Sequence, residues 1–198
     1  MRLQLLTLQN MLRTSTLALF FLCYGCTNGS FLGQDQGLEL HSLGPEQLQL
    51  HCDSTIAAAM PSTTTEGELW ATNIPVPQLE SGEFESGQIT RMQVLWIPMP
   101  GKTPLASTST NITITQYVFS GDEVGVYIGA GYGWPSGSPE EGLSILMEDA
   151  TVELQSSSPN FLDLMTPSTM RGHIYAKANP KLARKIAAHA RQYSFIEE

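Results

Sequence analysis

The chain has 198 residues, of which 41% are hydrophobic and 15% are charged, and its formal net charge at pH 7 is −9. This length suits one domain of ordinary size with its own core, and a body this acidic repels nucleic acid. After Cys26, no uninterrupted apolar stretch approaches the roughly 20 residues that a membrane-spanning helix needs.

The N-terminal segment has the three parts of a secretory signal. Basic residues at positions 2 and 13 precede the apolar run Leu17–Tyr24, and the small residue Gly25 then precedes Cys26. With these features the segment resembles a bacterial lipoprotein precursor, in which a small residue precedes the cysteine that is acylated. The resemblance implies a signal peptide over residues 1–25, a lipidated Cys26 and a membrane-anchored protein of the bacterial cell envelope that faces the periplasm or the exterior.

Two features leave alternatives open. Such precursors usually carry Leu three residues before the modified cysteine, whereas this chain has Cys23 there, so ordinary secretion or an uncleaved anchor is also compatible with the segment. Met11 offers a second start site. Cleavage before Cys26 followed by acylation leaves Cys52 as the only thiol, and its place in a period-2 apolar pattern predicts that it is buried and inert.

Beyond the signal, the chain is expected to form a tether and then one β-rich domain. Residues 26–37 lack periodicity and are rich in glycine and polar residues, which is typical of a flexible tether, and residues 38–198 are assigned to the domain. Alternating apolar residues predict a first strand over Glu46–Ala58. Pro75 and Pro77 cannot donate to a strand ladder, so Leu69–Val76 is predicted to be an edge strand or an extended segment.

The middle of the chain predicts three strands. The first is Ile89–Ile97, and the second is Asn111–Phe119, whose apolar phase slips near Gln116 and so indicates a bulge or burial on both faces. A Gly-Asp turn at 121–122 leads into Val124–Gly131, so the second and third strands are predicted to form an antiparallel hairpin.

The last third alternates loops and strands. Gly133–Gly142 is predicted to be a loop, and Leu143–Leu154 a strand with a bulge or break at Glu148 and Asp149, where its apolar phase changes. A short helical turn is expected over Asn160–Met165 and a last strand over Gly172–Ala178.

An amphipathic helix is predicted over residues 180–194, with Asn179 as its N-cap and Pro180 at its first position. Seven or so short strands and one terminal helix indicate an antiparallel β-sandwich or open barrel.

No catalytic, metal or cofactor site emerges from the motifs. The run Gly129–Pro135 lacks the following helix and basic residue of a phosphate-binding loop, so its glycines are expected to let another element pack closely. His51 and Asp53 share a strand face, but zinc needs three or four converging ligands. A hydrolase remains an alternative that would require His41, His51 or His173 to converge with carboxylates, and no nucleophile motif supports it.

Two sets of residues are candidates for binding. Tyr132 and Trp134 stand beside a Pro/Gly-rich segment and could stack on a ligand. Residues 27–170 contain 17 acidic and 2 basic residues, whereas residues 171–196 contain 6 basic and no acidic ones. This segment could dock on the acidic body, on anionic lipid or on an acidic partner, and four of its bases lie on the predicted helix: Lys181, Arg184, Lys185 and Arg191.

The sequence therefore favours a cell-envelope lipoprotein whose domain is a non-enzymatic structural or interaction module, with a possible envelope protein partner and no nucleic acid. A binding module for a small apolar ligand or a glycan is the alternative. The oligomeric state does not follow from the sequence.

Overall fold

The computed structural model describes residues 37–61, 67–99, 101, 103, 109–138 and 140–193, all within a compact unit that spans Asp35–Glu198. The predicted signal peptide, Cys26 and the tether up to residue 36 lie outside the described residues. Gly37, assigned to the end of the tether, is the first residue of a strand.

Within those ranges the chain forms nine strands, two α-helices and a short 3-10 turn. The elements are β1 (Gly37–Ser42), β2 (Gln49–Cys52), β3 (Ile56–Pro61), β4 (Gly67–Thr72), α2 (Val76–Ser81), β5 (Ser86–Val94), β6 (Ile112–Ser120), β7 (Glu123–Ser138), β8 (Gly142–Ser157), β9 (Ser168–Ala178), α3 (Pro180–Ala190) and η1 (Arg191–Tyr193).

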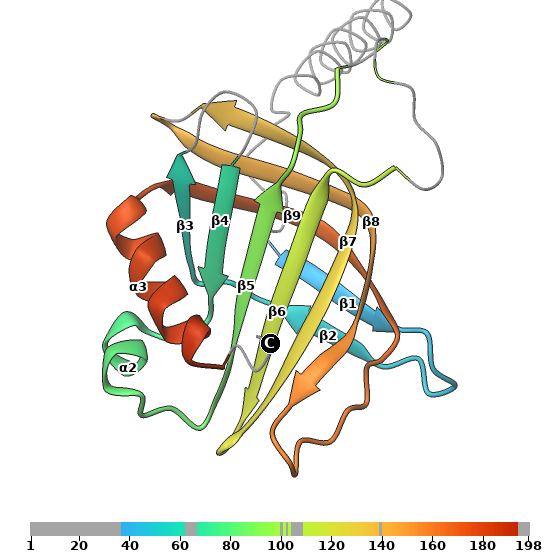
Figure 1. Cartoon of the computed structure of the whole chain (residues 1–198), viewed down its shortest axis with the longest axis vertical. Helices are drawn as coiled ribbons and strands as arrows, with labels where there is room; N and C mark the ends of the chain where they lie inside the picture. Colours follow the sequence, from blue (N-terminus) through green and yellow to red (C-terminus); the bar gives the residue numbers. More distant parts are fainter. Residues whose placement is uncertain are drawn as a thin grey trace, which may run out of the picture. The chain divides into compact units, whose positions relative to one another are not determined.

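The strands make one sheet in the order β2-β1-β9-β3-β4-β5-β6-β7-β8, which bends until β8 also pairs with β9 (Figure 1). All pairings are antiparallel except β3–β9, which is parallel and joins only two residue pairs. The prediction of a mainly β, antiparallel fold with one C-terminal amphipathic helix is confirmed. The strand count is higher than expected because one predicted strand is divided in two and the unpredicted β1 precedes it.

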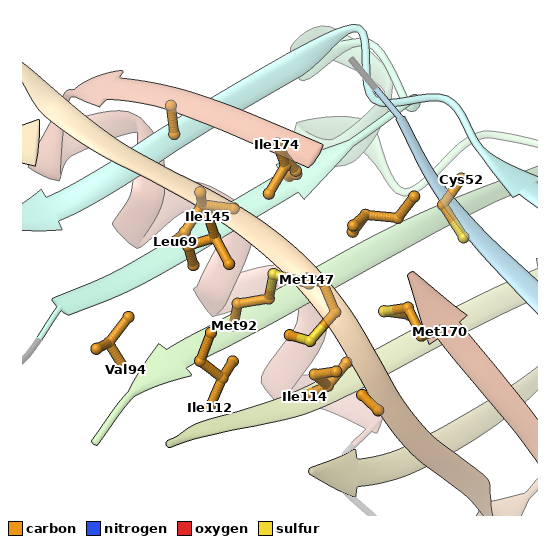
Figure 2. Packing of buried hydrophobic residues seen from close by; sticks show 14 of the residues in the cluster. Cys52, Leu69, Met92, Val94, Ile112, Ile114, Ile145, Met147, Met170 and Ile174 are labelled. Carbon is orange, nitrogen blue, oxygen red and sulfur yellow. The ribbon is translucent and has the colours of Figure 1, made fainter. Parts of the chain in front are cut away.

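The concave side of the bent sheet encloses an interior core. It is filled by aliphatic and sulfur-containing side chains from eight of the strands, many of them fully buried (Figure 2). Those labelled in the close-up are Cys52, Leu69, Met92, Val94, Ile112, Ile114, Ile145, Met147, Met170 and Ile174. Cys52 points into this core as predicted, and burial raises the pKa of its thiol to about 12, which keeps it protonated and unreactive.

A second core lies on the outer side of the sheet, where α3 packs across β3 and β4 beside α2 (Figure 1). It contains Trp70, Ile89, Tyr117 and Phe119 from the sheet, and Ile186 from α3. The sheet thus buries apolar residues on both sides: back to back in β3 and β4, where Trp70 faces outwards between Leu69 and Ala71, and at different places along β6.

These two cores explain the phase slip in β6. Ile112 and Ile114 enter the interior core, whereas Tyr117 and Phe119, on the opposite face, enter the outer core. The ladders to β5 and β7 run through β6 without a register shift, so the strand has no bulge and is buried on both faces, one of the two predicted alternatives. Gln116 points inward, and its Nε2 donates to Gln88 Oε1 at 3.0 Å, so the interior is polar where the outer core begins.

The phase change in β8 has a different cause. Tyr132 of β7 pairs with Asp149 and Gly133 pairs with Met147, so Glu148 is an additional residue in the ladder. The predicted bulge is confirmed. It lets Met147 on one side and Ala150 on the other both enter the interior core although they are three residues apart.

Two predictions in the first half of the chain were wrong. The single strand over Glu46–Ala58 is divided into β2 and β3 by a break at residues 53–55, and β1 precedes it. The segment Leu69–Val76 contains a central strand, β4, because its prolines follow the strand. Pro75 and Pro77 lie at the start of α2, where a missing N–H costs no helical hydrogen bond.

Further boundaries differ: β8 continues to Ser157 and β9 begins at Ser168. β5 ends at Val94 instead of Ile97, and the predicted loop Gly133–Gly142 is the end of a long hairpin in which β7 continues to Ser138. No helical turn forms over Asn160–Met165. That segment instead crosses the end of the sheet with Phe161 packed on Gly125, where a Cβ would lie 2.3 Å from the ring.

The C-terminal helix begins as predicted. Asn179 Oδ1 accepts a hydrogen bond from the Leu182 backbone N–H at 3.1 Å, and Pro180 occupies the first helical position. In the described part of the chain, no helix has both the length and the apolar character that crossing a membrane would require.

The closeness of β7 and β8 predicts a strict need for glycine at position 129. A Cβ there would lie 2.0 Å from the Thr151 carbonyl oxygen, which belongs to the backbone and cannot yield easily. We expect Gly129→Ala to lower the free energy of unfolding, measured by urea denaturation, by about 1–3 kcal/mol. Gly37→Ala is the control, because its added Cβ would make an ordinary 3.6 Å contact. Equal stability of the two variants would contradict the prediction.

Candidate functional site

The two aromatic residues singled out in the sequence lie together on the outer face of β7. Tyr132 and Trp134 are half-buried, and their rings make an edge-to-face contact with centroids 5.3 Å apart. They alternate with Gly131 and Gly133, which face the interior side and are buried. A third ring joins them from the segment after β5, since Trp96 lies 6.3 Å from Tyr132.

Asn111 fixes this arrangement from within. The side chain is fully buried, and its Nδ2 donates to the Trp96 carbonyl at 3.3 Å and to the Gly133 carbonyl at 2.9 Å. Its Oδ1 accepts from the Gly133 N–H at 2.9 Å. Trp96 Nε1 also donates to the Thr110 carbonyl at 3.0 Å. The segment carrying Trp96 is therefore tied to β7 by a polar side chain that satisfies groups of both.

Exposed aliphatic residues are near the ring-bearing residues in the chain or in the ladder. In the segment after β5, Leu95, Ile97 and Met99 are 41%, 44% and 60% exposed, while Pro98 between the last two is buried. Leu146 of β8 is directly opposite Trp134 in the ladder and is also exposed. The rings and these side chains together are called the aromatic patch: Leu95, Trp96, Ile97, Met99, Tyr132, Trp134 and Leu146.

Tyr132 contributes its ring to the patch. Its hydroxyl is buried and has no hydrogen-bond partner among the described residues. Burial of the hydroxyl and the nearby Glu148 carboxylate raise the pKa of Tyr132, so it stays neutral at physiological pH. The phenol is not activated as an acid or a nucleophile.

The histidines form two separate groups on the outer face. His41 Nε2 lies 3.1 Å and His51 Nδ1 3.6 Å from the Glu39 carboxylate, and the hydrogen bond from His41 is the main cause that lowers the pKa of Glu39. His173 Nε2 lies 2.8 Å from Ser144 Oγ, a pairing that the sequence did not suggest because the residues are on different strands.

Neither group matches a catalytic or metal site. His173 Nδ1 is buried without a partner, so no carboxylate orients the ring as in a Ser-His-Asp triad. Within the described ranges, no set of three or more His, Cys, Asp or Glu side chains converges as metal ligands.

The predicted basic residues lie on the outward face of α3 and, for Arg191, at the first residue of the adjoining η1. Lys181, Arg184, Lys185 and Arg191 are all exposed, whereas the opposite face is buried against the outer core. Lys185 Nζ forms an ion pair with Glu80 of α2. The other three have no ion pair within the residues that the structure describes.

A shallow groove of about 240 Å³ separates α2 from α3. Leu79, Leu182 and Ile186 supply apolar walls, and Lys185 and Glu80 border it. His189 also contributes to the wall, and its Nε2 is buried without a partner. The sequence did not reveal this groove, because α2 was predicted to be an extended segment.

His189 sits among aromatic rings. Its centroid lies 5.4 Å from Phe84, 6.1 Å from Phe119 and 5.4 Å from Tyr193. Burial lowers the pKa of the imidazole, and a hydrogen bond to the Leu79 carbonyl opposes this only in part. The ring is therefore neutral at pH 7.

Sequence reasoning found Tyr132 and Trp134 but missed Trp96 and Asn111 as parts of the same surface. Trp96 lay within the strand predicted over Ile89–Ile97, which separated it from Tyr132 and Trp134. The one available signal was the apolar run Leu95–Met99, which continues past the end of β5 without the alternation of a half-buried strand.

Asn111→Ala is expected to loosen the aromatic patch. It leaves the Trp96 carbonyl and the Gly133 backbone groups without their partner, which costs about 1–3 kcal/mol for each buried group left unpaired. We expect lower stability in urea and greater acrylamide quenching of tryptophan fluorescence in the native state. Gln155→Ala, which removes an exposed amide that makes no side-chain hydrogen bond within the described residues, serves as the control. Unchanged quenching in Asn111→Ala would contradict the role of the Asn111 hydrogen bonds, called the Asn111 clamp, in ordering the aromatic patch.

His189 predicts a loss of stability in mild acid. Its pKa in the folded state lies below that in the unfolded state, about 6.5, so the unfolded chain takes up the proton first. The contribution of neutral His189 to the free energy of unfolding is fully present well above pH 6.5. It is lost as the pH falls below the pKa of the unfolded state towards the lower pKa of the folded state. We expect His189→Leu to flatten the dependence of urea-unfolding stability on pH between 6.5 and 5. If His189→Leu keeps the pH dependence of the wild-type stability, His189 is not the group responsible for it.

Comparisons of the chain with protein-family models, with curated proteins and with solved structures gave no match. What the protein does is therefore inferred from its own sequence and geometry.

Proposed function

We propose that this chain is an envelope-anchored, non-enzymatic interaction domain. Its lipidated Cys26 holds it at a membrane, and it binds an envelope protein through the aromatic patch. The observation that carries the proposal is the cluster of the Trp96, Tyr132 and Trp134 rings, whose neighbours in the chain or the ladder include exposed aliphatic residues: Leu95, Ile97, Met99 and Leu146.

The composition of the patch favours a protein surface as its ligand. Contiguous exposed apolar side chains mark interaction sites, and Trp, Tyr and Met are enriched at the centre of protein interfaces. The three rings contact one another, and Asn111 ties the backbone of Trp96 to that of Gly133. The rings are therefore already ordered and lose little conformational entropy on binding.

The other functions considered from the sequence, binding of an apolar ligand or a glycan and hydrolysis, have less support. An internal apolar ligand would need space within the bent sheet, which is occupied by the buried side chains of the interior core. A glycan would need polar side chains around the rings; Glu148 and Asp149 supply them beside Tyr132, whereas Trp134 faces the aliphatic Leu146 in the ladder.

A hydrolase would need a nucleophile beside an oriented base. His173 lies beside Ser144 but its Nδ1 has no orienting partner, whereas His41 and His51 lie beside the Glu39 carboxylate and no nucleophile is seen with them among the described contacts.

Site-directed photo-crosslinking in cells tests the patch. A photoreactive amino acid at Ile97 is expected to give a discrete adduct, and Trp134→Ala in the same chain should abolish it because one of the three rings is removed. The same amino acid at exposed Thr151, outside the patch, is the control. A matching adduct from Thr151, or an Ile97 adduct that survives Trp134→Ala, would contradict the proposal.

The anchor has its own test. Mass spectrometry of the native N-terminus should find acylated Cys26 as the first residue. A mature chain that starts at another residue, or an unmodified Cys26, would contradict the lipid anchor. The aromatic patch is tested separately, by the crosslinking experiment.

A further inference from the structure

The outward face of α3 carries an unusual concentration of positive charge. Its positions 181, 184, 185, 188 and 191 follow the spacing of one helical face, and four of these five residues are Lys or Arg. The helix itself contains no acidic residue. At a rise of 1.5 Å per residue, the charges extend over about 15 Å along the helix. These four residues, Lys181, Arg184, Lys185 and Arg191, are called the basic stripe.

The direction of the basic stripe is fixed by packing. Ala183, Ile186, Ala187 and Ala190 on the opposite face are at most 1% exposed, and the Asn179 cap sets where the helix begins. The helix cannot turn its charges towards the sheet without exposing this apolar face. The stripe is therefore a preformed surface on a rigid support.

The protein neutralises little of this charge itself. Lys185 pairs with Glu80, but Lys181, Arg184 and Arg191 make no ion pair within the described residues. The helix α3 thus docks on the acidic body through its apolar face, with one ion pair at its side, and Arg171, earlier in the basic segment, pairs with Glu39. Residues 27–170 are strongly acidic, so the positive charge of the basic stripe contrasts with the rest of the chain.

We propose that the basic stripe is a docking surface for an anionic phospholipid membrane. Each Lys or Arg near such a surface adds a similar increment of attraction, without requiring a shaped pocket, and a straight row of charges suits a planar array of headgroups. The apolar groove between α2 and α3 adjoins the stripe at Lys185 and offers a shallow apolar surface beside the headgroups. The inference builds on the proposed envelope location, because it supplies the second membrane contact that a lipid-anchored domain would use.

An anionic membrane fits the stripe better than the other candidate partners. Nucleic acid is repelled by the acidic remainder of the chain. An acidic protein would have to match the spacing of the individual charges, whereas mobile headgroups adjust to them. The apolar face of α3 is already buried in the outer core, so attraction to the membrane would be electrostatic and sensitive to salt.

Vesicle co-sedimentation tests the inference without relying on the anchor. The full chain with Cys26→Ser is mixed with phosphatidylcholine vesicles, either pure or with phosphatidylglycerol added. We expect stronger binding to the anionic vesicles, lost in high salt. A variant with Lys181→Gln, Arg184→Gln and Arg191→Gln should reduce the anionic component at least about tenfold. Lys185 is left unchanged to preserve its ion pair with Glu80.

The control variant carries Gln47→Glu, Gln49→Glu and Thr151→Glu. It lowers the net charge by the same amount at exposed positions away from α3, so it should keep most of the anionic component. Circular dichroism and thermal unfolding establish that both variants are folded. Equal binding to neutral and anionic vesicles, or equal losses in the two variants, would overturn the inference. Because Cys26 is absent throughout, failure here is distinct from failure of the anchor, which N-terminal mass spectrometry decides.

Discussion

The structure depends on one sheet having to bury two cores on opposite faces. A strand such as β6 gives Ile112 and Ile114 to the interior, then gives Tyr117 and Phe119 to the helix-covered outer face. The exchange occurs without a bulge, at Gln116, where the interior side becomes hydrogen-bonded and polar. Because α3 covers only one end of the outer face, the same strands leave the other end without helical cover.

The uncovered end of the outer face is where the aromatic patch forms. β7 and β8 approach so closely that glycines occupy the inward positions of β7, and Tyr132 and Trp134 take the outward ones. The bulge at Glu148 changes the phase of β8, so that Leu146 stands opposite Trp134 while Met147 still enters the interior. The packing that closes the sheet therefore also arranges its exposed rings.

The packing of α3 also decides where its positive charges lie. The apolar face of α3 completes the outer core, so its basic residues must face solvent. The proposed functions use the two surfaces in different ways: the aromatic patch for a partner protein, and the basic stripe for an anionic membrane. Each proposal can fail without the other, because the residues that carry them lie on different elements.

The sequence by itself determined the features that depend on neighbouring residues. The Asn179 cap, the turn at 121–122, the bulge near Glu148 and the inward direction of Cys52 all follow from local chemistry or short periodicity. The position of Tyr132 and Trp134 beside each other was also readable from their spacing on one strand. Only the tertiary structure decided what joins distant segments: the bend that pairs β8 with β9, the helix started by Pro75 and Pro77, and the Asn111 clamp that brings Trp96 to the patch. These depend on contacts across many residues of chain, and no local pattern encodes which strand becomes the neighbour of another.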